Sequence, residues 1–129
     1  MIVVDTHAVI WMSQEQELLS EAASAALIEA RQDGGLAIAD ITLREIALLI
    51  TRGRVTVSTP LTAYLSFIES LFKVLPIDGR TAEQSMRFGP AYPKDPADRL
   101  IGATAVIHGA RLVTKDEKIR ASGEVGCVW

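Results

Sequence analysis

Four acidic residues of this chain occur at the boundaries of predicted elements, where they could gather into one site. Asp5 and Asp116 each follow a short apolar run, and Glu45 and Asp98 lie near the start of two helical patterns. Two carboxylates about 4 Å apart repel each other by roughly 4 kcal/mol at an effective dielectric near 20. Four of them together would therefore need a cation, and oxygen ligands select hard ions such as Mg²⁺ or Mn²⁺.

Each of these acids also has a purely structural explanation. Asp5 and Asp116 suit turns or helix N-caps that follow a strand. Glu45 could complete a capping box with Thr42, three residues before it. Asp98 would lie in a first helical turn, where a carboxylate favours the helix dipole. These local explanations do not account for the positions of Glu45 and Asp98 on their helices. Both acids share a helix face with apolar residues, where a lone carboxylate would be poorly solvated.

Three further polar residues lie close to these acids. Asp95 precedes Pro96, so we interpret Asp95 as an N-cap and Asp98 as the acid that does chemistry. His7 is two residues from Asp5, but the chain has no pair of histidines at zinc-ligand spacing, which disfavours zinc. Asp40 could be a supporting acid, although we interpret it as a solvated loop residue.

The order of the predicted elements determines whether the four acids can meet. Short apolar runs alternate with helical patterns of about ten residues, which predicts βαβ units and a parallel sheet with helices on both faces. The fold class expected is α/β, with three α/β/α layers around a mostly parallel sheet of about five strands. The strands are predicted at residues 2–5, 36–39, 73–76, 111–114 and 126–129. The helices are predicted at residues 6–12, 20–31, 42–53, 60–72, 81–88, 96–108 and 116–121, with a loop at 88–95. Ligands of such sheets bind beyond the carboxyl ends of the strands, where Asp5 and Asp116 would lie.

Length and composition limit the domain number, the possible partners and the expected location of the protein. With 129 residues, we expect a single domain over 1–129. Thirteen basic and 16 acidic side chains give a net charge of −3, so nucleic-acid binding would have to come from local chemistry. The one cysteine cannot form an internal disulfide. No targeting segment or membrane span is evident, which predicts a soluble cytoplasmic protein.

Four segments together resemble the PIN-domain ribonucleases, and most of all the VapC-type toxins of toxin–antitoxin pairs. They are IVVDTH at 2–7, TLREIA at 42–47, DPADRLI at 95–101 and LVTKD at 112–116. The resemblance implies a PIN-like fold over the whole chain and metal-dependent cleavage of RNA. It also implies that Asp5, Glu45, Asp98 and Asp116 form the family's acidic quartet and use Mg²⁺ or Mn²⁺.

The resemblance assigns a role to each position. Asp5 and Asp98 would be the principal metal ligands, Asp116 a direct or water-mediated ligand, and Glu45 would position the attacking water or complete the metal shell. Thr6 and Thr114 match small hydroxyl positions of the pocket, and Arg99 matches a position that we interpret as structural. Four basic side chains flank the expected mouth and could follow an RNA backbone, although a solvated surface position is the better explanation for any one of them: Lys94, Lys115, Lys118 and Arg120.

The apolar surface indicates partners. Residues 46–50 are apolar almost all round their helix, and Trp11, Phe67 and Phe72 add bulk. Any part left exposed would suit a homodimer interface or a groove for an apolar peptide. By resemblance, that peptide would belong to a cognate VapB-type antitoxin.

Three other functions compete with this interpretation. A phospho-accepting receiver domain needs an acceptor Asp near mid-chain, and residues 50–60 contain no acid. A haloacid-dehalogenase-like phosphatase needs an acid at position 7, where this chain has a histidine. The strongest alternative is a PIN-fold module that binds RNA or protein with little turnover.

Overall fold

The computed structural model describes all residues, 1–129, and contains one five-stranded sheet. Every pairing in it is parallel and the strand order is β3-β2-β1-β4-β5. The strands are β1 (Ile2–Val4), β2 (Leu36–Ala39), β3 (Lys73–Leu75), β4 (Arg111–Val113) and β5 (Cys127–Val128). The predicted α/β class is confirmed, and the sheet is wholly rather than mostly parallel.

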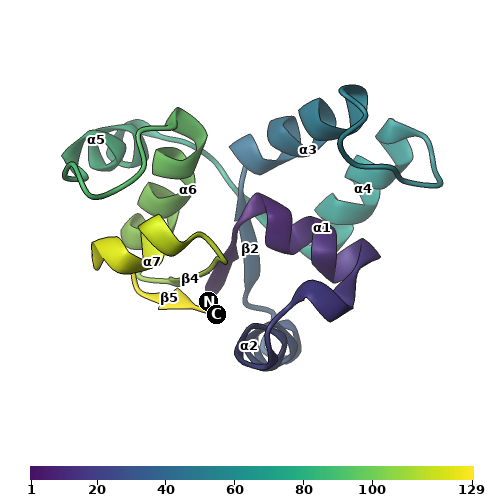
Figure 1. Cartoon of the computed structure of the whole chain (residues 1–129), viewed down its shortest axis with the longest axis horizontal. Coiled ribbons are helices and arrows are strands. Elements are labelled where there is room, and N and C mark those ends of the chain that lie inside the picture. Colours follow the sequence, from purple (N-terminus) through teal and green to yellow (C-terminus); the bar gives the residue numbers. More distant parts are fainter.

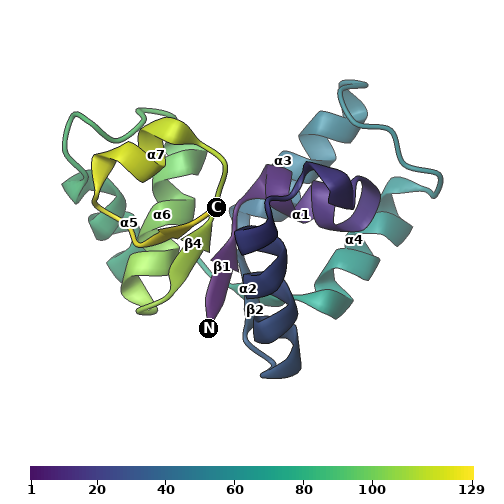
Figure 2. The same ribbon diagram turned by 60° about the horizontal axis from the view of Figure 1, so that its bottom comes forward.

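Seven α-helices and one 3₁₀ helix connect or follow the strands. They are α1 (Thr6–Gln14), η1 (Gln16–Leu18), α2 (Glu21–Gln32), α3 (Ile41–Thr51), α4 (Leu61–Leu71), α5 (Gly79–Arg87), α6 (Pro96–Ile107) and α7 (Glu117–Ser122). Helices α1, α2 and α4 lie on one side of the sheet, and α5, α6 and α7 lie on the other (Figures 1 and 2). The chain therefore forms the three expected layers.

The alternation of side chains along the strands explains the two cores. Ile2 and Val4 point into a core shared with α1, α2, α3 and α4, while Val3 points into a core with α6, α7 and the loop that carries Phe88 and Tyr92. All three side chains are at most 4% exposed, as expected for a parallel strand that is covered on both faces.

The structure corrects several predicted boundaries. Four of the strands are shorter than predicted, and β1 ends at Val4, so Asp5 is the N-cap of α1 rather than a strand residue. Helix α5 begins at Gly79, two residues early, because Asp78 caps it by accepting from the amide of Thr81.

The predicted capping box at the start of α3 is wrong. The helix begins at Ile41, so Thr42 lies inside its first turn and is fully buried. The Thr42 hydroxyl lies 3.2 Å from the hydroxyl of Thr6 in α1. A contact with a residue 36 positions away has therefore replaced the local cap.

The structure has no helix that combines the length and the apolar character needed to cross a membrane.

Candidate active site

The site lies where the strand order changes direction. From β1 the chain moves to β2 and β3 on one side, and it later returns to β4 and β5 on the other. The carboxyl ends of β1 and β4 are therefore neighbours, and the amide of Asp5 donates to the carbonyl of Val113 over 3.0 Å. Crevices at such switch points are the usual ligand sites of parallel sheets. Asp5 and Asp116 follow these two strands.

Asp5 is held by two donors from different strand ends. Its Oδ1 accepts from the amide of Thr6 at 2.8 Å, and its Oδ2 accepts from the hydroxyl of Thr114 at 2.7 Å. Burial raises the pKa of Asp5, whereas the Thr114 and Thr6 hydrogen bonds lower it. The carboxylate is thus fixed in place at an energetic cost to its charged form.

Glu45 reaches the same place from α3. Its Oε1 accepts a 2.6 Å hydrogen bond from the hydroxyl of Thr6, the first residue of α1. Burial raises the pKa of Glu45, the Thr6 hydrogen bond lowers it, and the charge of Asp5 raises it further. The two acids are therefore close enough to influence each other's ionisation.

Helix α6 contributes two acids with different roles. Asp95 caps the helix, because its Oδ1 accepts from the amides of Ala97 and Asp98. The hydrogen bonds at Asp98 involve only its backbone, which leaves its carboxylate free. Burial, followed by the charges of the neighbouring acids with Asp5 first, raises the pKa of Asp98 to about 7.

Asp116, which follows β4 and precedes α7, completes the set. It caps α7 by accepting from the amide of Ile119 at 3.0 Å, and its own amide donates to the Thr114 hydroxyl. The N-cap role predicted for Asp5 and Asp116 therefore coexists with a place at the site, since both residues cap helices and both line the pocket.

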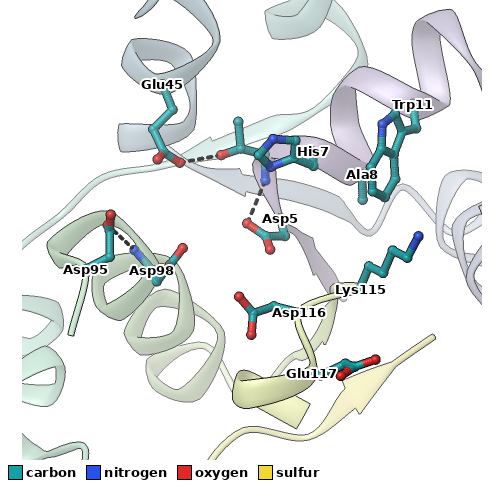
Figure 3. A pocket seen from close by; sticks show the side chains of 11 residues that line it. Asp5, His7, Ala8, Trp11, Glu45, Asp95, Asp98, Lys115, Asp116 and Glu117 are labelled. Atoms are coloured by element: carbon teal, nitrogen blue, oxygen red, sulfur yellow. Dashed lines mark hydrogen bonds between the residues drawn. The ribbon is translucent and has the colours of Figure 1, made fainter. Parts of the chain in front are cut away.

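These side chains surround one open pocket of about 580 Å³ (Figure 3). The structure brings all four predicted site residues, Asp5, Glu45, Asp98 and Asp116, to its wall. The other lining residues are Thr6, His7, Ala8, Trp11, Asp95, Lys115 and Glu117. Six of the lining residues are acidic, whereas Lys115 and His7 are the only basic ones, so the pocket is strongly acidic.

Arg99 fixes the loop that leads into α6. Its guanidinium donates to five backbone carbonyls between Ser85 and Pro93, at 2.9 to 3.5 Å. In the same loop, the rings of Phe88 and Tyr92 are buried and stacked with centroids 4.1 Å apart. The loop is therefore anchored on both sides, and Arg99 has the structural role that its position suggested.

Two sequence interpretations near the site are revised. Asp40 lies outside the pocket and is only half-buried in a turn, where its carboxylate accepts from the amide of Ile77, so its role is to hold that turn. Trp11, considered only as apolar bulk, lines the pocket and lies beneath Lys115, whose Nζ is 5.6 Å from the Trp11 ring centroid. The sequence did contain an indication of this position. Trp11 is four residues after His7, which places both side chains on one face of the helix that follows Asp5.

The donor set has the chemistry of a hard-cation site. It contains carboxylate oxygens and no cysteine, and the free carboxylate of Asp98 could bind an ion without losing a hydrogen bond. As the side chains lie, however, no three of the acidic, histidine or cysteine groups form a ready-made metal-binding cluster. The residues fit Mg²⁺ or Mn²⁺ in type, and binding would require the carboxylates to move closer together.

Comparison with known proteins identifies the class. The sequence matches the PIN domain family over residues 2–124, and the chain belongs to that family. It is 37% identical over 120 residues to Ribonuclease VapC22 of Mycobacterium tuberculosis, which covers 93% of this chain and 90% of that protein.

Solved structures share the fold. VapBC2 from Rickettsia felis, bound to a DNA fragment from its promoter, gives a TM-score of 0.74 at 15% identity and covers 98% of this chain and 97% of that one. A toxin–antitoxin complex from Klebsiella pneumoniae gives 0.71 at 23% identity and covers 100% and 97%. The PIN-like fold expected from the four segments is confirmed.

Proposed function

We propose that this chain is a ribonuclease of the VapC type that hydrolyses RNA phosphodiester bonds at the acidic pocket, with Mg²⁺ or Mn²⁺ as cofactor. The observation that carries the proposal is that Asp5, Glu45, Asp98 and Asp116, from four separate elements, line one open pocket at the switch point of the sheet. The 37% identity to a ribonuclease supports the choice of RNA as substrate.

Each side chain has a role that follows from its contacts. Asp5, Asp98 and Asp116 would hold the cation, which would lower the pKa of a water molecule and neutralise charge on the phosphate. Glu45 would orient the attacking water, because Thr6 fixes one of its oxygens and leaves the other available. The raised pKa of Glu45 makes it a better proton acceptor than an exposed glutamate.

The proposed biological setting is a toxin–antitoxin pair in the cytoplasm. Two of the solved structures with this fold are described as toxin–antitoxin or VapBC complexes, which supports a VapB-type antitoxin as partner. Helix α3 supports an apolar partner surface, since only Thr42 and Ile46 of its 11 residues are buried while Leu48, Leu49 and Ile50 stay partly exposed. The same surface would suit a homodimer.

The direct test is an RNA digest with Mn²⁺ or Mg²⁺ and with chelator. We expect wild-type protein to cleave only with metal, and Asp98→Asn or Glu45→Gln to lose at least about 100-fold, in the range for general acid–base groups. Asp33→Asn is the matched control, because this exposed acid follows α2 and lies outside the acidic pocket. Equal cleavage by Asp98→Asn and Asp33→Asn would remove Asp98 from the mechanism.

One observation favours a second candidate, a PIN-fold module that binds RNA without turnover. The acids do not form a ready-made metal cluster, so a protein that never assembles one would look the same. That candidate predicts RNA binding that persists in chelator and no cleavage products with either metal.

A further inference from the structure

A second groove, of about 500 Å³, adjoins the acidic pocket. Both hollows are lined by His7 and Trp11, so these two side chains stand at the boundary between them. Anything that extends from the acidic pocket across Trp11 enters this groove. None of the four acids of the proposed active site lines it.

One wall of the groove is a single face of α1. His7, Ile10, Trp11 and Gln14 follow the i, i+3, i+4, i+7 spacing that places side chains on one side of a helix. The rings of His7 and Trp11 are 5.9 Å apart, and Trp11 also contacts the Trp129 ring at 5.8 Å. The Trp11 ring is therefore held in position by packing, while the side chain stays partly exposed.

The opposite wall depends on the turn that ends α3. Gly53 adopts a left-handed conformation with φ of 73°, which a residue with a Cβ adopts only with strain. The turn lets the amide of Arg54 donate to the carbonyl of Leu49 at 2.9 Å, and it brings Val55 to the same carbonyl. Leu49, Arg54 and Val55 thus face α1 across the groove.

The charge of Arg54 has no partner within the chain. The only ion pair joins Arg87 and Glu83 in α5, and Arg54 takes part in no side-chain hydrogen bond even though Glu15 lines the same groove. An exposed guanidinium without an internal partner is available to a phosphate or to the acceptor edge of a base.

We propose that this groove is a nucleobase subsite, in which a base next to the scissile phosphate stacks on Trp11 while Arg54 binds the RNA beyond it. The subsite combines one aromatic face, the aliphatic side chains of Ile10, Leu49 and Val55, and the polar groups of Gln14 and Arg54. Aromatic stacking with an adjacent basic group is how proteins hold single-stranded nucleic acid. The assignment rests on the proposed ribonuclease function and adds a substrate subsite to it.

RNA is favoured over a protein segment as occupant. The groove is continuous with the pocket that would hold the scissile phosphate, because the two share His7 and Trp11. On the pocket side, Lys115 lies over the Trp11 ring, and on the groove side, Arg54 lines the wall together with one acid, Glu15. This arrangement suits a stacked base with phosphates on either side.

The binding test uses the intrinsic fluorescence of Trp11. In a Trp129→Phe background, Trp11 is the single tryptophan of the chain. Single-stranded 12-nucleotide RNA of mixed sequence should quench its emission in chelator, whereas a sugar–phosphate oligomer of the same length without bases should not. Equal quenching by both oligomers, or none by either, would overturn the subsite.

The cleavage test compares three replacements of the same residue. Trp11→Phe keeps an aromatic face, Trp11→Leu keeps apolar bulk without one, and Trp11→Ala removes both. With Mn²⁺ we expect Trp11→Phe to retain most of the wild-type kcat/KM, and Trp11→Leu and Trp11→Ala to lose about 5- to 150-fold, the range for one stacked base. Removal of the stacked base from the RNA should cause the same loss in wild type and no further loss in Trp11→Leu.

The outcomes separate this subsite from the proposed function. Trp11→Leu could cleave RNA as fast as wild type, with unchanged Mn²⁺ affinity and circular dichroism. That result would be consistent with the ribonuclease function but would contradict the nucleobase subsite, and the groove would then suit another occupant, such as a protein partner. Base-dependent quenching of Trp11 fluorescence in the Trp129→Phe protein, combined with no RNA cleavage by the wild-type chain, would support the subsite and contradict the ribonuclease function.

Discussion

Thr6 connects two of the proposed catalytic acids through its backbone and its side chain. Its amide donates to Asp5, and its hydroxyl donates to Glu45 over 2.6 Å. Thr42 lies 3.2 Å from that hydroxyl and limits its rotation. One small residue therefore sets the relative orientation of two carboxylates from different helices, which makes Thr6 a positioning residue rather than a catalytic one.

Replacement of Thr6 should affect turnover more than metal binding. We expect Thr6→Val to reduce kcat by about 10- to 100-fold, because a hydrogen bond to a charged group is worth roughly 1.5–3 kcal/mol. KM and Mn²⁺ affinity should change little. The lost bond lowers the pKa of Glu45 in the wild type, so the acidic limb of the pH–rate profile should move to higher pH in the variant. Thr6→Ser should restore both kcat and the position of the acidic limb. A Thr6→Val protein in which only KM changes would contradict the positioning role of Thr6.

The pKa of Asp98 gives the metal-free protein a specific pH dependence. This pKa is about 7 in the folded protein and near 3.8 in the unfolded chain, so between these values the folded state binds the extra proton. Stability in chelator should therefore fall as pH rises from about 4 to 7 and then level off. The raised pKa values of Asp5 and Glu45 act in the same direction.

Urea denaturation at pH 5 and pH 8 measures this effect. Asp98→Asn should reduce the slope and be the more stable protein at pH 8, by on the order of 1 kcal/mol after allowance for solvent screening of a partly exposed group. Parallel pH profiles for wild type and Asp98→Asn would show that the repulsion at this pocket is negligible. The affinity for Mn²⁺ should rise with pH up to about 7, because the ion competes with the Asp98 proton.

At the scale of elements, α6 and the loop before it pack as one unit. Gly102 lies in α6 where a Cβ would overlap the hydroxyl of Tyr92, and Tyr92 is buried and stacked on Phe88. The Tyr92 hydroxyl also donates to the carbonyl of Asp98 at 2.7 Å. Because Gly102 has no side chain, Tyr92 can pack closely against α6 and donate its hydrogen bond to the helical turn that carries Asp98.

Gly102→Ala tests this packing. Alanine normally favours a helix over glycine by about 1 kcal/mol, but here the added methyl should destabilise the fold by about 1–3 kcal/mol because of overpacking. Gly79→Ala is the control, since a Cβ at the start of α5 meets nothing within 4 Å. Urea denaturation should show a lower midpoint for Gly102→Ala and an equal or higher one for Gly79→Ala. Equal stability of the two variants would contradict the close packing.

Comparison of α3 and α6 shows what the sequence could predict. The start of α6 was predictable because Asp95 and Pro96 act on their own neighbours as an N-cap and an N1 residue. The start of α3 was not, because Thr42 pairs with Thr6 and leaves the local capping pattern unused. For the same reason the pattern at Glu45 predicted a capping role, whereas the structure directs its carboxylate to another helix.

At the scale of the whole molecule, the parallel topology was the predictive feature of the site. It implied that the residues after β1 and β4 would meet, and Asp5 and Asp116 do line one pocket. Residue spacing could not reveal the adjoining groove. Its wall at Arg54 depends on the left-handed turn at Gly53, and its other wall on the packing of Trp11 against Trp129 from the opposite end of the chain.

The exposed apolar side chains make the oligomeric state testable. Phe67 is 48% exposed on α4, a helix that packs against the partly exposed helix α3. We expect light scattering to show a dimer at high micromolar concentration, and Phe67→Glu to shift it toward monomer by at least about tenfold in dissociation constant. Met86→Glu on α5, at 83% exposure, is the control and should stay dimeric. A wild-type chain that remains monomeric would rule out this interface.

The contact between Trp11 and Trp129 has a practical consequence for handling the protein. Residue 129 follows β5 at the same edge of the sheet as the acidic pocket, whereas Met1 precedes β1 at the opposite edge. A purification tag or a fluorescent label fused after residue 129 would emerge beside the proposed entrance for RNA. Fusions placed ahead of Met1 would keep that entrance clear.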